Sequence, residues 1–112
     1  MLLLLKKYRV ISMKKIHNEL TNRFFQSILN LKTIEDCQNF FEDVCTIKEI
    51  QDMSQRLEVA YLRNDGMSYQ EVLAQTGVST ATISRVNKCL NYGSGGYKKA
   101  LSTLPERKDI EK

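Results

Sequence analysis

The residues best suited to bind a ligand lie in one short stretch, in which small and hydroxyl side chains precede two bases. Its members are Ser79, Thr80, Ala81, Thr82, Ser84, Arg85 and Lys88. At the start of a helix, such small side chains would let the backbone enter a major groove of DNA. There hydroxyls reach phosphates or base edges and methyl groups touch thymine. Arg85 and Lys88 would follow on later turns, beside the phosphates that flank the groove.

A helix-turn-helix from about Ser68 to Leu90 would hold this stretch in place. Ser68-Tyr-Gln-Glu71 is a capping box that starts a short helix from Tyr69 to Gln75. Gly77 in the turn can take a positive φ, and we expect Val78 to fill the space between the two helices. Ser79 is a suitable N-cap for the second helix, which turns three apolar residues inward: Ile83, Val86 and Leu90.

Two more polar residues, Ser68 and Gln70, complete the predicted DNA-binding set at the start of the first helix. One residue departs from the usual pattern of such units. Many have a small side chain four residues before the turn glycine, whereas this chain has Leu73 there. We therefore expect the two helices to cross at a somewhat different angle.

The rest of the chain also predicts helices, because no Gly or Pro occurs between Met13 and Asn64. Apolar residues recur every three or four positions, which is typical of helices with one buried face. Thr33 is suited to an N-cap, and Thr46 and Glu49 form another capping box. The expected helices run over residues 13–31, 34–44, 47–63 and 97–104, so the fold class is all-α.

Two pairs of adjacent aromatics, Phe24-Phe25 and Phe40-Phe41, spread apolar surface over more than one helix face. A chain of 112 residues has little other structure to cover such surface. The pattern favours packing against a second copy, and therefore a homodimer. A compact monomeric bundle is the alternative.

Charge is unevenly distributed around the net value of +4. Residues 1–15 carry five bases and no acid, whereas no acid occurs from Ser79 to Pro105. We divide the chain into a basic tail over 1–13, a single domain over 14–104 and a C-terminal tail over 105–112. The leucines at the N-terminus are too few for a membrane span, so we expect no membrane association. The three widely spaced cysteines are most simply reduced, and with the predicted DNA binding they indicate a cytoplasmic, nucleoid-associated protein.

Enzyme and metal chemistry find little support in the sequence. His17 is the only histidine, and the three cysteines form no CxxC motif, so we expect no metal site. The glycines at 93–96 lack the Lys and Ser/Thr of a phosphate-binding loop and follow a helix rather than a strand. We expect no catalytic residues and no cofactor, and we interpret the glycines as a flexible joint.

Taken together, three segments resemble the Trp-repressor-related YerC/YecD family: FQSILNLKTIEDCQNFFEDV, CTIKEIQDMSQRLEVAYLRNDGMSYQEV and AQTGVSTATISRVNKCLNYG. The resemblance covers about Asn18 to Leu104. It implies a Trp-repressor-like helical domain that forms an interlocked dimer. Two recognition helices would then read a pseudo-palindromic operator, with half-sites about one helical turn apart.

The same resemblance carries over residue by residue onto Ala81-Thr82-Ile83-Ser84-Arg85, where the family's DNA-facing positions fall on Thr80, Ala81, Thr82 and Ser84. The ligand pocket is less well preserved. Its arginine matches Arg85, but its glycine is Val86 here and its serine is Cys89. Its second arginine has no secure match, although Arg56 lies nearby. We interpret these four residues as a vestigial ligand pocket, and we expect no tryptophan binding.

The sequence thus predicts a dimeric DNA-binding transcriptional regulator that acts as a repressor. The alternative is a helical dimeric interaction module whose helix-turn-helix no longer reads DNA. Hydroxyl-rich recognition helices read DNA partly through water and shape, so no operator sequence follows from these residues. Nor does the sequence identify a small-molecule effector.

Overall fold

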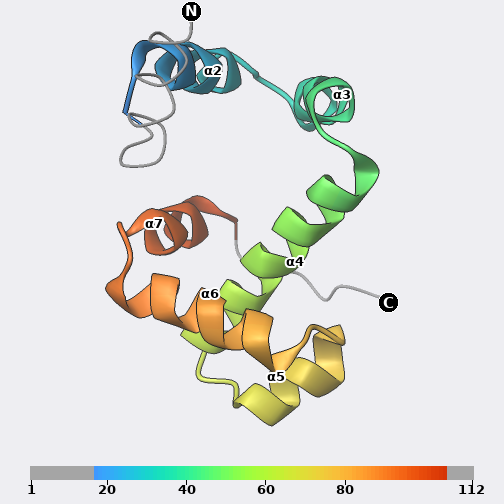
Figure 1. The fold of residues 1–112 in the computed structure, drawn as a ribbon, viewed down its shortest axis with the longest axis vertical. Coiled ribbons are helices and arrows are strands. Elements are labelled where there is room, and N and C mark those ends of the chain that lie inside the picture. The colour runs from blue at the N-terminus through green and yellow to red at the C-terminus, as the bar shows by residue number, and fades with distance from the viewer. Residues whose placement is uncertain (1–16, 106–112) are drawn as a thin grey trace, which may run out of the picture. The chain divides into compact units, whose positions relative to one another are not determined.

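The computed structural model describes residues 17–105, and every regular element in that range is a helix (Figure 1). The chain forms two compact units, one ending at Cys45 and the other beginning at Thr46. The first contains α2 and α3, and the second contains α4 to α7. The predicted all-α fold class is confirmed for this part of the chain.

Helix α2 spans Glu19–Leu29, a shorter range than the predicted helix over 13–31. Asn18 stops it from extending backwards, because its side chain accepts a hydrogen bond from the Thr21 amide at 2.9 Å. In return the Thr21 hydroxyl accepts from the Asn18 amide at 3.3 Å, which completes a capping box. The predicted start at Met13 lies outside the described residues, and Asn30 caps the other end two residues early.

Helix α3 spans Ile34–Val44 and begins at the predicted N-cap, where Thr33 accepts a hydrogen bond from the Asp36 amide. Its aromatic residues contact those of α2. The ring centroids of Phe24 and Phe40 are 5.9 Å apart, and those of Phe40 and Phe41 are 5.4 Å apart. Even so, no residue of α2 or α3 is buried. The first unit therefore has aromatic contacts but no closed core of its own.

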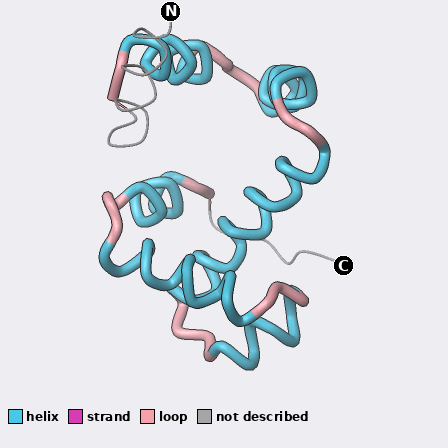
Figure 2. The backbone as a smooth tube through the Cα atoms, viewed as in Figure 1, coloured by secondary structure: helices cyan, strands magenta, loops and turns pink. Residues whose placement is uncertain are grey.

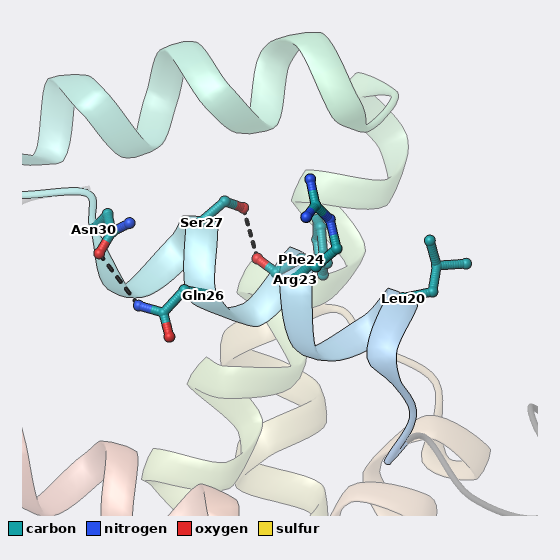
Figure 3. Close-up of a pocket in the computed structure, with 6 residues that line it drawn as sticks. All are labelled: Leu20, Arg23, Phe24, Gln26, Ser27 and Asn30. Carbon is teal, nitrogen blue, oxygen red and sulfur yellow. Dashed lines mark hydrogen bonds between the residues drawn. The ribbon is translucent and has the colours of Figure 1, made fainter.

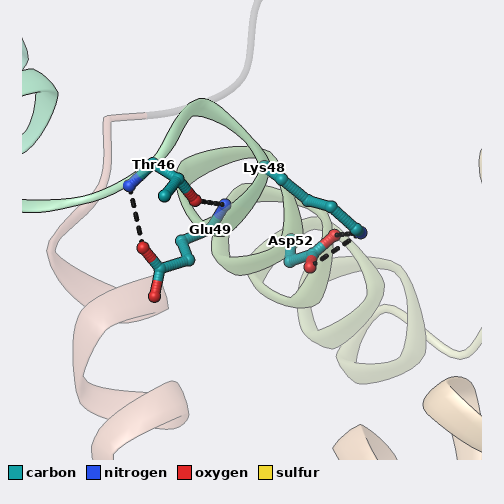
Figure 4. Close-up of polar contacts among 4 residues, drawn as sticks. All are labelled: Thr46, Lys48, Glu49 and Asp52. Carbon is teal, nitrogen blue, oxygen red and sulfur yellow. Dashed lines mark hydrogen bonds and ion pairs between the residues drawn. The ribbon is translucent and has the colours of Figure 1, made fainter.

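Helix α4 spans Ile47–Asn64 and begins at the predicted capping box (Figure 4). The Thr46 hydroxyl accepts from the Glu49 amide at 3.1 Å, and the Glu49 carboxylate accepts from the Thr46 amide at 2.8 Å. At the start of the same helix, Lys48 and Asp52 form an ion pair, with 3.1 Å between Nζ and Oδ2. The capping box fixes where the long helix begins, while the exposed ion pair contributes little stability.

Three short helices pack around the second half of α4: α5 over Tyr69–Thr76, α6 over Thr80–Tyr92 and α7 over Gly96–Thr103. Both α5 and α6 contact α4 and each other, and α7 contacts α4 and α6. Figure 2 shows the short loops that connect them. The core of this unit consists of Val59, Ala60, Leu62, Val72, Val78, Ile83, Val86 and Leu90.

The second unit agrees with the sequence-based expectations except at helix ends. The helices α4 and α5 each end one residue later than predicted, and α6 continues to Tyr92 rather than Leu90. The last helix is displaced by one residue, because Gly96 already belongs to it. No helix within residues 17–105 is long and apolar enough to cross a membrane.

Candidate nucleic-acid interface

The turn between α5 and α6 has the conformation that the sequence predicts. Gly77 adopts a left-handed conformation with φ of 72°, and its amide donates to the Leu73 carbonyl at 2.8 Å. The Thr76 hydroxyl donates to the Val72 carbonyl and accepts from the Val78 amide at 3.2 Å. These bonds pair the backbone groups at the turn and direct the chain into α6.

Val78 anchors the turn from the inside. Its side chain is only 8% exposed and belongs to the same apolar cluster as Val72 on α5 and Ile83 on α6. The expectation that it fills the space between the two helices is therefore confirmed. With its apolar face fixed against α4, α6 presents its opposite face to solvent.

The exposed face of α6 carries most of the predicted DNA-binding residues. Side chains that face solvent belong to Ser79, Thr80, Ala81, Ser84, Arg85 and Lys88. Only Thr82 is half-buried. Residues 80, 84 and 88 repeat at one helical turn, so they form a row along one side of the helix. Along the exposed face as a whole, the small side chains come first and the two bases, Arg85 and Lys88, come later, which is the order that a groove-inserted helix requires.

Two of the predicted residues already hold the helices in place. The Ser79 hydroxyl accepts from the Thr82 amide at 3.3 Å and donates to the Thr82 hydroxyl at 3.1 Å. The Ser68 hydroxyl accepts from the Glu71 amide at 3.1 Å. These hydroxyls are N-caps as well as candidate DNA contacts, whereas Gln70 is exposed and forms no part of a cap.

The electrostatic character of α6 suits a phosphate backbone. The helix contains Arg85 and Lys88 and no acidic residue. Its N-terminal amides carry partial positive charge, which the missing acid in the first turn leaves unneutralised. The acids that cap α4 and α5 lie on other helices. The surface around α6 is thus basic and small at the position where a groove would be entered.

The residues of the predicted vestigial pocket differ in burial. Val86 is 2% exposed and belongs to the core, whereas Arg85, Cys89 and Arg56 are exposed. Val86 therefore fills space beside α4 that a glycine would leave open. Residues 17–105 contain no cluster of side chains that could bind a metal ion.

Tyr97 at the start of α7 interacts electrostatically with two of these residues, Cys89 and Arg56. The sequence-based prediction did not identify it. Partial burial raises the pKa of its phenol, the nearby Cys89 thiol raises it further, and the Arg56 guanidinium lowers it. The three side chains therefore come from α4, α6 and α7 and lie close enough to affect one another. The apolar spacing of Tyr97 and Leu101 was the only signal in the sequence, and both pack against the core.

Sequence reasoning also missed Arg63 in the last turn of α4. Its guanidinium donates from Nε to Oδ1 of Asn87 at 3.0 Å and from Nη1 to the Met67 carbonyl at 2.6 Å. It also lies 4.7 Å from the centre of the Tyr69 ring. Nothing in the local pattern indicates these contacts, because Asn87 is 24 residues away.

The first unit has an open hollow of about 500 Å³ along α2, lined by Leu20, Arg23, Phe24, Gln26, Ser27 and Asn30 (Figure 3). Three of its polar side chains form local hydrogen bonds, those of Ser27, Gln26 and Asn30. Ser27 donates to the Phe24 carbonyl at 2.6 Å, and Gln26 donates to Asn30 at 3.3 Å. The hollow is one side of an exposed helix and holds no group that is poised for catalysis.

The comparisons with known proteins agree with this geometry. Residues 19–105 match the family model described as Trp repressor protein. The chain is 49% identical to the uncharacterized protein YerC of Bacillus subtilis, over 82% of this chain and 88% of that protein. A TrpR-like protein from Eubacterium eligens superimposes with a TM-score of 0.76 at 45% identity, over 83% of this chain and 99% of the other.

A second solved structure, of a Staphylococcus aureus protein, also gives a TM-score of 0.76. It is 40% identical to this chain, and the superposition covers 80% of this chain and 90% of the other. The matched range contains the helix-turn-helix and the helices before it. The predicted family and fold are therefore confirmed over most of the chain.

Proposed function

Because the chain belongs to the Trp repressor family, we propose that it is a sequence-specific DNA-binding transcriptional regulator. It represses by occupying a pseudo-palindromic operator as a dimer. The family consists of helix-turn-helix regulators and not of enzymes, so the chain is not an enzyme. Its place of action is the cytoplasm, at the nucleoid.

One observation carries the proposal: the exposed face of α6 is small and hydroxyl-bearing at its start, basic further along and free of acid throughout. The groove-facing residues are Thr80, Ala81, Thr82 and Ser84, with Ser79 beside them. Arg85 and Lys88 pair with phosphates. Ser68 and Gln70 approach the backbone from the start of α5.

The exposed apolar surface of the first unit supports the homodimer. Leu20, Leu29 and Ile34 are 56%, 75% and 78% exposed. Aliphatic side chains this exposed on neighbouring helices are costly in water, and a second copy would cover them. Two recognition helices related by a two-fold axis would then read two half-sites. The domain assigned to residues 14–104, with tails over 1–13 and 105–112, would be completed by this pairing.

Tryptophan is not part of the proposed mechanism. Val86 occupies the core position that matches the glycine of the family's ligand pocket, and its side chain leaves no space there. Arg56, Arg85 and Cys89 remain as exposed remnants of that site. We therefore propose operator binding without tryptophan as a cofactor.

The alternative function, a helical dimeric interaction module that does not read DNA, rests on the same exposed apolar residues of α2 and α3. The charge and small side chains of α6 separate the two proposals, because a pure packing helix has no need of them. A charge-reversal experiment on α6 decides between them.

The test exposes the protein to a pool of random-sequence duplexes and then measures binding of the enriched duplex. Thr80→Glu places an acid on the first turn of α6, where it suits the helix dipole and preserves folding. Ser84→Glu adds the same charge one turn later, at another exposed position of α6. Ser102→Glu on α7 is the matched control, since it adds the same charge at an exposed position on a different helix.

We expect both α6 variants to remain folded dimers and to bind the enriched duplex at least tenfold more weakly, with Ser102→Glu close to the parent. Failure of the parent protein to enrich any sequence, despite a dimer shown by light scattering, would favour the interaction module. A monomer at micromolar concentration would contradict the dimer.

A further inference from the structure

Arg63 connects three segments of the helix-turn-helix through one side chain. It lies in the last turn of α4 and is half-buried. Its Nε donates to Asn87 on α6, its Nη1 donates to the carbonyl of Met67 before α5, and its guanidinium faces the ring of Tyr69 on α5. Both acceptors are neutral oxygens, so the contacts are directional rather than simple charge pairs.

Asn87 is well placed to transmit this contact to the recognition face. At 100° per residue, it lies within about 20° of Thr80 around the axis of α6, two turns further along. It therefore sits at the border between the buried face, which includes Ile83, and the exposed row that starts at Thr80. Its side-chain oxygen also accepts a hydrogen bond from Asn91 at 3.3 Å, which holds the amide in one orientation.

The apolar core determines which face of α6 is buried, but hydrophobic burial alone leaves small rotations of α6 about its own axis possible. Contacts among residues such as Val59, Val72 and Ile83 are favourable in many similar arrangements, because the hydrophobic effect has no direction. A planar guanidinium with two bonded acceptors tolerates much less movement. Binding sites need their groups held within about 0.5 Å and 10–20°.

We infer that Arg63 is a positioning residue that sets the orientation of α6 against α4 and α5, and through it the affinity for specific DNA. This inference rests on the proposed function for its DNA readout. Arg63 itself touches no base, because its Nε and Nη1 are engaged inside the protein. Its loss leaves α6 folded but able to rotate slightly, so the contacts that depend on exact geometry weaken first.

The first measurement compares Arg63→Met and Arg63→Lys with the parent on two duplexes: one enriched by the parent from a random pool, and a scrambled sequence of equal composition. We expect about tenfold weaker binding of the enriched duplex and little change on the scrambled one. Arg63→Lys keeps the charge but lacks the planar fork, so it should lose nearly as much.

Lys48→Met is the matched control, since it removes one positive charge from the exposed start of the same helix. We expect it to bind both duplexes like the parent. Circular dichroism at the binding temperature shows that each variant is folded. Equal weakening on both duplexes, with the slope of log K against log salt reduced by about one, would instead make Arg63 a phosphate contact and overturn the inference.

A second measurement needs no DNA. Urea unfolding of Arg63→Met, Asn87→Ala and the double variant, at one protein concentration, forms a double-mutant cycle. We expect the effects on the unfolding constant to be non-additive by a factor on the order of ten, as for a hydrogen bond to a charged group. Additive effects would overturn the inference even if DNA binding is established. If the parent enriches no duplex, the proposed function fails while this cycle still tests the role of Arg63.

Discussion

The hydroxyl of Ser79 donates a hydrogen bond of 3.1 Å to the hydroxyl of Thr82, at the N-terminus of the helix that carries the proposed DNA contacts. Ser79 also accepts from the Thr82 amide, so one hydroxyl caps α6 and orients its neighbour. A side chain that keeps the cap but changes the charge can therefore separate folding from DNA binding. Two substitutions of Ser79 use this relationship.

Ser79→Ala removes the cap and should lower the free energy of unfolding by about 1 kcal/mol. Ser79→Asp keeps an acceptor for the Thr82 amide and suits the helix dipole, so we expect stability at or above that of the parent. Its negative charge would face phosphate, and binding of an enriched duplex should fall at least tenfold. Urea unfolding and fluorescence anisotropy measure the two effects. A stable Ser79→Asp variant with unchanged DNA affinity would place the tip of α6 away from DNA.

Gly93 is the C-cap of α6, and its backbone lies close to that of Cys89 in the last turn of the helix. Its amide donates to the Cys89 carbonyl at 2.9 Å, and a Cβ at this position would overlap that same carbonyl oxygen. Gly93→Ala should therefore displace backbone and cost about 1–3 kcal/mol. Gly96→Ala is the matched control, because a Cβ there meets nothing within 4 Å. Thermal unfolding of both variants checks this. Equal melting temperatures of the two variants would mean that the backbone at the end of α6 adjusts to a Cβ at Gly93 without loss of stability.

Local chemistry explains which parts of the fold the sequence predicts. The caps at Thr46 and Ser68 and the turn at Gly77 follow from neighbours within four residues, and the structure contains all three. The start of α2 at Glu19 was not predicted, because apolar spacing continues upstream and the Asn18–Thr21 cap is not the usual Ser/Thr with Glu. Helix ends depend on a few weak bonds, so spacing alone leaves them uncertain by one or two residues.

The candidate site follows the same rule. The exposed row from Thr80 to Lys88 is readable from helical periodicity, as is the burial of Val86. The hydrogen bond of Arg63 to Asn87 and the electrostatic effect of Cys89 on Tyr97 are not, since they involve separate helices. A sequence pattern states which face of a helix is apolar, but it does not state which polar side chains meet across a helix interface.

Acid should destabilise the second unit through its two capping boxes. Hydrogen bonds from Ser68 lower the pKa of Glu71 below its ordinary 4.5, and those from Thr46 do the same for Glu49. A lowered pKa in the folded state means that the stabilisation is present above pH 4.5 and is lost as pH falls through the folded-state value. Glu49→Gln with Glu71→Gln should therefore flatten the fall in melting temperature between neutral pH and about pH 3. A fall as steep as in the parent would assign acid sensitivity to other carboxylates.

Val86 should contribute to stability instead of to ligand binding. Its side chain is 2% exposed inside the core, so Val86→Ala leaves a cavity and should cost about 2 kcal/mol. In a domain of this size that corresponds to roughly 8–16 °C in melting temperature. Because the same side chain fills the position of the family's pocket glycine, millimolar tryptophan should not raise the melting temperature of the parent protein. A ligand that binds only the folded state raises the melting temperature, and the rise grows with the ligand concentration relative to the Kd. A rise of several degrees with tryptophan, absent with an equal concentration of leucine, would show that the pocket opens despite Val86 and would restore tryptophan to the mechanism.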